Sequence, residues 1–126
     1  MAVILIVEDE DQVRVLAESC LQEQGHQTVS AATAEDALAM LDVTERVDLL
    51  FTDIALHGDI RAGLDLAKQA VERRPSLKVL YTTGQGITHG MIARFVPGSA
   101  ALQKPYTVGQ LQTSLAQNFG IESTSC

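Results

Sequence analysis

A short, uninterrupted apolar run near the start limits the possible folds more than any other feature of this chain. Residues 2–7 (AVILIV) are all apolar, and the run is too short to be a buried helix of its own. A strand that is apolar at every position is buried on both faces, which is typical of a parallel sheet between two layers of helices. Two further apolar runs follow at 47–52 (VDLLFT) and 78–82 (KVLYT). The sequence therefore predicts an α/β fold.

Helical patterns alternate with these strands. Before Gly25, apolar residues recur at i, i+3, i+4, i+7 and i+8, which predicts a helix with one buried stripe: Val13, Leu16, Ala17, Cys20 and Leu21. Three more helices are predicted after Thr33, over 64–71 and after Thr107, with a short one at 89–95. Weaker strands at 27–31 and 100–103 complete the alternation. About five βα units and a parallel sheet with right-handed crossovers are expected.

Length and charge exclude several classes of protein. The 126 residues fit one domain, which we place at 1–119, with a C-terminal tail at 120–126. Sixteen acidic residues against nine Lys and Arg give a net charge of −7, which argues against binding to nucleic acid or an anionic membrane. No apolar run approaches ~18 residues, the start lacks the pattern of a signal peptide, and Cys20 and Cys126 have neither disulfide nor metal spacing. A cytoplasmic protein is expected.

Polar side chains follow four of the five predicted strands. In an open α/β sheet, ligands bind beyond the carboxyl ends of the strands, so these residues are expected to share one edge. They are Glu8 and Asp9 after the first strand, Asp53 after the third, Thr82 and Thr83 at the fourth, and Lys104 and Pro105 after the fifth.

Carboxylates gathered in this way favour metal and phosphoryl chemistry. Three of them repel one another unless a cation intervenes, and a set of oxygen ligands suits Mg²⁺. A carboxylate beside Mg²⁺ can attack a phosphoryl group, as aspartyl-phosphate chemistry requires. The ammonium of Lys104 and the hydroxyl of Thr83 can then stabilise the phosphoryl oxygens.

Four short motifs occur in order at the spacing of a known family. VED at 7–9, TD at 52–53, TTG at 82–84 and QKP at 103–105 resemble the receiver domain of two-component response regulators, over about residues 2–119. The stretches at 75–86 and 102–111 most resemble receivers appended to hybrid histidine kinases. Met1 directly before the first strand favours a stand-alone protein.

The resemblance implies a fold and a set of site residues. The fold is a doubly wound, five-stranded parallel sheet with order 2-1-3-4-5, the (βα)₅ flavodoxin-like receiver fold. Asp53 becomes the phosphoacceptor, and Mg²⁺ is held by Glu8, Asp9, Asp53 and the backbone carbonyl of Ala55. Thr83 becomes the switch hydroxyl, Lys104 binds the phosphoryl group, and the Lys104–Pro105 bond is expected to be cis.

The function implied by the resemblance is a phosphorylation-controlled signalling switch. A sensor histidine kinase or a histidine phosphotransfer protein would donate a phosphoryl group to Asp53, and the signal would leave through contact with an unknown downstream protein or through a phosphorelay. Homodimer formation is compatible with this function. The chain would be no enzyme beyond Mg²⁺-dependent self-phosphorylation and autodephosphorylation.

Two alternatives stay open at this stage. An interaction module that keeps the fold without phosphotransfer would be expected to lose its acids or Lys104, and the chain retains both. A Mg²⁺-dependent aspartyl-phosphate phosphatase would want a second acid two residues after Asp53, where the chain has Ala55.

Several positions depart from the family pattern. Ala101 stands where an aromatic switch residue is common, and His57 stands where Pro is frequent. His26, His57 and His89 lack metal-like spacing and are predicted to lie on the surface. Because Ala101 has no ring to move, we expect phosphorylation to order residues 84–98, whose helical pattern is weak.

Overall fold

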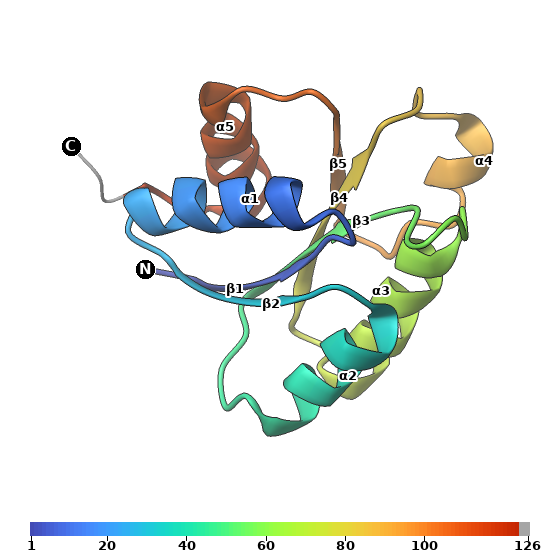
Figure 1. Ribbon diagram of the computed structural model, residues 1–126, viewed down its shortest axis with the longest axis horizontal. Coiled ribbons are helices and arrows are strands. Elements are labelled where there is room, and N and C mark those ends of the chain that lie inside the picture. Colours follow the sequence, from blue (N-terminus) through green and yellow to red (C-terminus); the bar gives the residue numbers. More distant parts are fainter. Residues whose placement is uncertain (124–126) are drawn as a thin grey trace.

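A parallel sheet of five strands forms the centre of the molecule (Figure 1). The computed structural model describes residues 1–123, and its strands lie in the order β2-β1-β3-β4-β5. The strands are β1 (Val3–Val7), β2 (Gln27–Ala31), β3 (Leu49–Asp53), β4 (Lys78–Thr83) and β5 (Ala100–Gln103). The predicted α/β class and strand order are confirmed.

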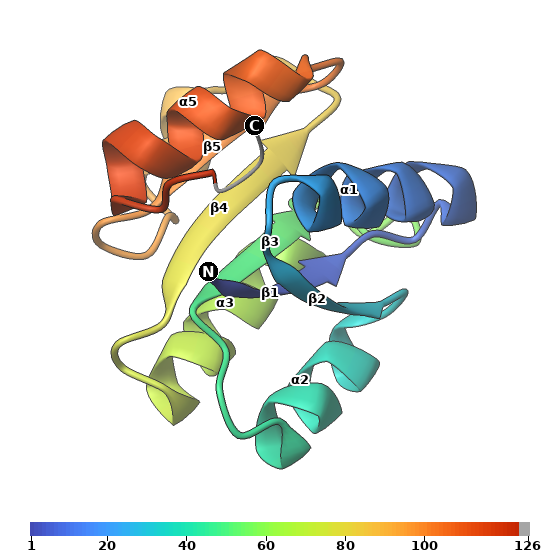
Figure 2. The ribbon, with the colours of Figure 1, turned by 90° about the vertical axis from the view of Figure 1, so that its left-hand side faces the viewer.

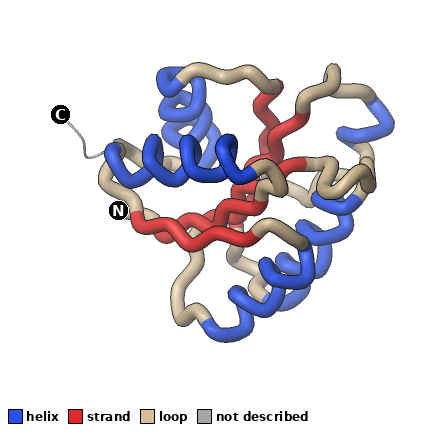
Figure 3. Tube along the Cα trace, viewed as in Figure 1, coloured by secondary structure: helices blue, strands red, loops and turns tan. Residues whose placement is uncertain are grey.

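Helices cover both faces of this sheet (Figures 1 and 3). They are α1 (Asp11–Glu23), α2 (Ala34–Val43), α3 (Ala62–Arg73), α4 (His89–Ile92) and α5 (Val108–Phe119). Helices α1 and α5 lie on one face, and α2 and α3 lie on the other (Figure 2). Each face has its own apolar cluster, because side chains of a strand point alternately to the two sides.

The two central strands, β1 and β3, are among those that the apolar runs predicted. Every residue of β1 and β3 is buried, as two helical layers require. The chain leaves β1 toward β2 and returns to the other side of β1 at β3. The strand order therefore reverses between β1 and β3, which opens a crevice at their carboxyl ends.

Hydrogen bonds at the helix ends follow the predicted capping. Thr33 Oγ1 accepts the N–H of Asp36 at 3.1 Å, and Thr107 forms a reciprocal capping box with Gln110. Helix α5 ends at Phe119, where Gly120 adopts a left-handed conformation with φ 66°. Residues 124–126 of the predicted tail, including Cys126, lie outside the described residues.

Two predictions about individual side chains were wrong, and one predicted helix is confirmed but ends earlier than expected. Leu16 is 69% exposed, because α1 turns Ala17 and Leu21 toward the sheet and leaves Leu16 beside them. His26 is only 5% exposed, because its ring lies at the start of β2, where Nδ1 accepts the N–H of Ala2. Helix α4 ends at Ile92, since the N–H of Phe95 donates three residues back, to the carbonyl of Ile92.

The bounds of the third strand also differ from the predicted range of 47–52. Strand β3 begins at Leu49 instead of residue 47 and continues to Asp53. The carboxylate of Asp48 accepts the N–H of Val3 at 2.8 Å, so this residue joins the strands through its side chain. Among residues 1–123, no helix has the length and apolar character that crossing a bilayer requires.

Candidate functional site

Three carboxylates meet at the carboxyl ends of β1 and β3. Glu8 and Asp9 follow β1 directly, and Asp53 is the last residue of β3. The parallel register pairs Val7 with Thr52, which brings these carboxylates to the same edge. One oxygen from each carboxylate lies within 4.8 Å of the others. Such a set of hard oxygen donors fits a magnesium ion.

Lys104 supplies a positive charge to two of these carboxylates. Its Nζ lies 2.6 Å from Glu8 Oε1 and 2.9 Å from Asp53 Oδ2. The lysine follows β5, and its own N–H donates to the carbonyl of Thr83 at 2.8 Å. The Lys104–Pro105 peptide bond is cis. The loop after β5 thus brings an ammonium group to the carboxylates that follow β1 and β3.

Burial and the lysine act in opposite directions on Glu8. Glu8 is only 4% exposed, and loss of hydration raises the pKa of its carboxyl group, while the hydrogen bond from Lys104 lowers it. The net pKa is raised from its ordinary value. For Lys104, burial lowers the pKa, but its hydrogen bonds to Glu8 and Asp53 outweigh burial, so the net pKa is raised. The contact between Glu8 and Lys104 therefore favours the charged form of each side chain, whereas burial disfavours it.

Asp9 has a different environment. Burial raises the pKa of its carboxyl group, but the main-chain N–H of His57, which donates to Asp9 Oδ2 at 2.8 Å, outweighs that effect together with Glu8. The net pKa lies below its ordinary value. Asp9 is thus held in the ionised form, which is the form that binds a cation.

The remaining predicted site residues lie at the same edge. Thr83 ends β4 and is buried, and its Oγ1 accepts the N–H of Gln85 at 3.1 Å. Its hydroxyl is therefore engaged with its own loop and not with a carboxylate. Ala55 lies in the half-buried start of the loop after β3.

A glycine sets how closely α3 approaches the acceptor strand. The N–H of Gly63 donates to the carbonyl of Ile54 at 2.8 Å. A Cβ at Gly63 would lie 1.8 Å from the carbonyl oxygen of Asp53, a distance that no packing allows. The backbone of Asp53 therefore keeps its position only if residue 63 has no side chain.

The sequence analysis missed two contributors to this region. The sequence marks His57 as a departure from proline and as a surface residue, but not as the main-chain donor to Asp9 that the structure shows. Tyr81 was counted as a strand residue, although its ring is fully buried against Phe95 on the side of β4 that also carries Thr83. The signal for Tyr81 was its position two residues before Thr83, since alternate strand residues share a face.

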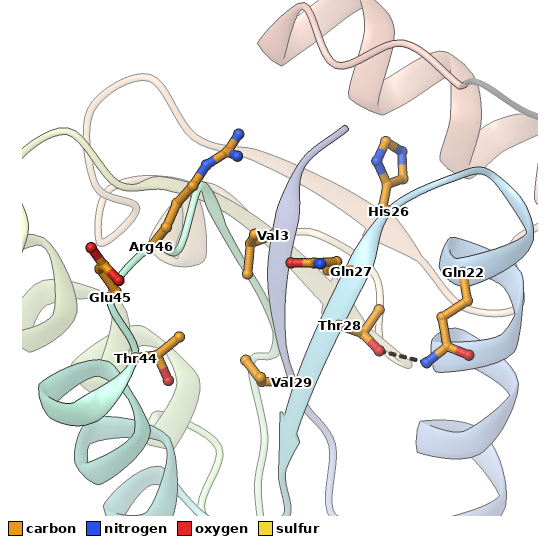
Figure 4. A pocket seen from close by; sticks show the side chains of 9 residues that line it. All are labelled: Val3, Gln22, His26, Gln27, Thr28, Val29, Thr44, Glu45 and Arg46. Atoms are coloured by element: carbon orange, nitrogen blue, oxygen red, sulfur yellow. Dashed lines mark hydrogen bonds between the residues drawn. The ribbon is translucent and has the colours of Figure 1, made fainter.

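A second hollow lies away from these residues, along the edge strand β2 (Figure 4). It is lined by Val3, Gln22, His26, Gln27, Thr28, Val29, Thr44, Glu45 and Arg46. Gln22 Nε2 donates to Thr28 Oγ1 at 2.8 Å across part of its wall. It includes the amino end of β2, whereas the carboxylates lie beyond the carboxyl ends of the strands. The acidic site is therefore the candidate functional site.

The comparisons with known proteins agree with this geometry. The model of the response regulator receiver domain matches residues 4–116. The chain belongs to the response regulator receiver domain family. This receiver domain is 30% identical over 109 residues to the nitrogen assimilation regulatory protein NtrX of Azorhizobium caulinodans, which covers 86% of the chain and 24% of NtrX. It is also 28% identical over 120 residues to the sensor kinase CckA of Brucella abortus, covering 92% of the chain and 12% of CckA.

Solved receiver structures share the fold. The crystal structure of a response regulator receiver protein from Sinorhizobium medicae superposes with a TM-score of 0.84 at 28% identity and covers 94% of each chain. The chain spans a quarter or less of NtrX and CckA, so the matched region is one part of each of those proteins. Receiver domains are phosphoacceptor switches of two-component systems and not classical enzymes.

Proposed function

We propose that this receiver domain accepts a phosphoryl group on Asp53 from a phosphohistidine, with Mg²⁺ bound by Glu8, Asp9, Asp53 and the carbonyl of Ala55. The observation that carries the proposal is the crowding of three carboxylate oxygens within 4.8 Å, with Lys104 Nζ 2.9 Å from Asp53. Three acids and a lysine at the reversal point of the sheet provide a nucleophile and its countercharges.

The chemistry follows from these groups. A carboxylate oxygen of Asp53 attacks phosphorus, an O–P bond forms, and the P–N bond to the donor imidazole breaks, leaving that ring to take a proton from solvent. The ammonium of Lys104 turns from Glu8 and Asp53 toward the new phosphoryl oxygens and offsets their charge. Bound Mg²⁺ would supply further positive charge at the same oxygens. Thr83 would donate its hydroxyl hydrogen to the phosphoryl group, and its Oγ1 could still accept the N–H of Gln85.

The donor has a surface beside the site. A groove between α1 and the β5–α5 loop includes Lys104 in its wall and is otherwise mainly apolar, with Val13, Leu16, Ala17, Cys20, Pro105, Tyr106 and Val108 among its lining residues. Leu16 and Val108 are both exposed there. We place the helix of a sensor histidine kinase or a histidine phosphotransfer protein in this groove, because its wall includes Lys104, whose Nζ lies 2.9 Å from Asp53 Oδ2.

Two other functions are less well supported. An aspartyl-phosphate phosphatase would need an acid at Ala55, and the side chain there is a methyl group. An interaction module without phosphotransfer has no need for Glu8 and Asp53, two carboxylates whose burial carries a desolvation cost. Downstream signalling by contact or phosphorelay, and homodimer formation, belong to the same proposal.

The test is adduct formation with Mg²⁺ and either acetyl phosphate or beryllofluoride. Mass spectrometry after borohydride reduction should locate one acyl phosphate, on Asp53, and none should form in Asp53→Asn or without Mg²⁺. Asp48→Asn is the matched control, because Asp48 is a carboxylate at the opposite end of the sheet. An adduct on Asp53→Asn, or no adduct on the wild type under any of these conditions, would contradict the proposed function.

A further inference from the structure

His57 lies at the tip of a tight turn that follows β3. The backbones of His57 and Gly58 both have positive φ, at 51° and 79°. The N–H of Asp59 donates to the carbonyl of Leu56 at 3.0 Å, and the N–H of Leu56 donates back at 3.1 Å. Two successive left-handed residues closed by such bonds are typical of a type I′ turn. His57 is the only residue other than glycine with positive φ in the range 1–123.

This turn directs a main-chain donor at a predicted metal ligand. The N–H of His57 points to Asp9 Oδ2 at 2.8 Å, across 48 residues of sequence. The left-handed conformation costs roughly 1–2 kcal/mol for a residue with a Cβ, so other contacts must offset it. One such contact is the ring of His57, whose Nε2 lies 2.9 Å from the carbonyl of Ala32 in the β2–α2 loop.

We propose that His57 is a positioning residue for Asp9: its main-chain N–H, presented by the left-handed turn, fixes the carboxylate of Asp9 so that a cation can bind. The inference rests on the proposed function, in which Asp9 is a magnesium ligand. One accepted hydrogen bond leaves the second oxygen and the unused lone pairs of Asp9 for the ion. Groups that orient a ligand from outside the coordination shell typically change metal affinity by about 10- to 100-fold.

The identity of residue 57 matters because proline could not do this. Proline has no N–H and holds φ near −65°, which conflicts with the 51° found here. The departure from the proline that is frequent in the family therefore gives Asp9 a main-chain hydrogen-bond donor that proline could not supply. The same geometry is consistent with the lowered pKa of Asp9, since an N–H donor favours the ionised carboxylate.

Magnesium titration of the full chain by isothermal calorimetry tests the inference. His57→Pro removes the donor and should weaken Mg²⁺ binding by about tenfold or more. His57→Val keeps the N–H but disfavours positive φ, and it should weaken binding several-fold, which retains the test if His57→Pro does not fold. His57→Asn keeps both the donor and the tolerance for positive φ, so its affinity should stay within about threefold of wild type. His89→Asn is the matched control at another exposed histidine.

A measurement without metal separates this inference from the proposed function. In magnesium-free protein, the amide of His57 should exchange slowly with solvent and lose that protection in Asp9→Ala, as followed by NMR. If wild type binds Mg²⁺ but His57→Pro and His57→Val bind it equally well, or His57→Asn loses affinity to the same extent as His57→Pro, the positioning role is wrong and the proposed function stands. Wild-type protein that binds no Mg²⁺ would overturn both.

Discussion

The ring of Tyr81 stacks on the ring of Phe95, with centroids 4.4 Å apart and an interplanar angle of 25°. The hydroxyl of Tyr81 also accepts the N–H of Val96 at 3.2 Å. In the β4–β5 ladder Tyr81 pairs with Ala101, the position where the family often has an aromatic residue. The aromatic group under α4 is thus supplied by β4, two residues before Thr83, and it is attached to the loop that leads to β5.

Tyr81→Phe should destabilise the fold by about 1–3 kcal/mol, because the buried N–H of Val96 would lose its acceptor. Urea denaturation measures the free energy of unfolding, and amide exchange should become faster at Val96. Tyr106→Phe is the control, since Tyr106 is partly buried but its hydroxyl has no hydrogen-bond partner within residues 1–123. Equal losses in the two variants would contradict the role of the Tyr81 hydroxyl.

Phosphorylation is expected to protect residues 84–98 from amide exchange. Residues 84–90 are all exposed, and Gln85 is attached to the site by its hydrogen bond to Thr83 Oγ1. When the hydroxyl turns toward a phosphoryl oxygen, the loop after β4, which is bonded to Thr83 Oγ1 through Gln85, should move with it and become ordered. Hydrogen exchange with and without beryllofluoride and Mg²⁺ measures this change. Protection confined to α1 would show that the signal leaves by another face.

Lys104→Ala should lower the free energy of unfolding by about 2 kcal/mol at pH 7 in metal-free buffer. The variant leaves Glu8 and Asp53 facing each other without their ammonium partner. Mg²⁺ should restore more stability to the variant than to wild type, and it should bind more tightly, because no ammonium competes with it. Urea denaturation in EDTA and in Mg²⁺ provides both values.

The control for this experiment is Arg46→Ala. Arg46 forms an ion pair with Asp48 at 3.0 Å, but its side chain is 59% exposed, so the loss should be within about 0.5 kcal/mol. If Lys104→Ala were as stable as this control in EDTA, the lysine would not be compensating the buried acids.

His26 should make the protein less stable in mild acid. Burial, aided by the nearby N-terminal charge, lowers the pKa of its ring below the ordinary 6.5. The unfolded chain therefore binds a proton before the folded chain does, and stability falls as pH falls below about 6.5, by at most ~1.4 kcal/mol per pH unit. His26→Asn retains an acceptor for the N–H of Ala2 and should lack this part of the slope.

Urea denaturation between pH 5 and 7.5 measures the difference between the two slopes. His89→Asn, at an exposed histidine, should keep the wild-type slope. Parallel curves for wild type and His26→Asn would mean that the His26 ring protonates as easily in the folded protein as in the unfolded chain.

Leu16→Asp should slow phosphotransfer from a phosphohistidine donor by roughly tenfold, because it places a charge in the apolar groove beside α1. Phosphorylation by acetyl phosphate should be unchanged, since that donor needs no docking surface. Rates of transfer from an autophosphorylated histidine kinase measure the effect. Val43→Asp, at an 83% exposed position on α2, is the matched control. An equal rate for Leu16→Asp and Val43→Asp would place the donor on another surface.

The sequence predicted the features that depend on which residues share a face or an edge. Apolar runs identified β1 and β3 as doubly covered strands, and the parallel arrangement then placed Glu8, Asp9 and Asp53 together. The sequence-based prediction failed where burial depends on how much of a helix its neighbours cover. Helical periodicity assigned Leu16 to the apolar stripe of α1, but it does not state how wide a stripe the neighbouring elements cover.

Hydrogen bonds of the main chain could not be predicted from the sequence, for a different reason. Every residue except proline carries the same N–H, so nothing in the letter His marks residue 57 as the donor to Asp9. Likewise, the acceptor role of the His26 ring depends on β1 and β2 starting side by side, which a pattern of letters does not specify.

The closeness of Gly63 to the carbonyl of Asp53 has a consequence for genetics. Any substitution at this position must displace either α3 or the residue that we propose to be phosphorylated, although Gly63 contributes no side chain to the reaction. Screens for alleles that no longer signal should therefore recover changes at Gly63 beside those at Asp53. The two classes of allele would differ in their response to a higher expression level. Overexpression should partly rescue a weakly folded Gly63→Ala protein, and it should never rescue Asp53→Asn.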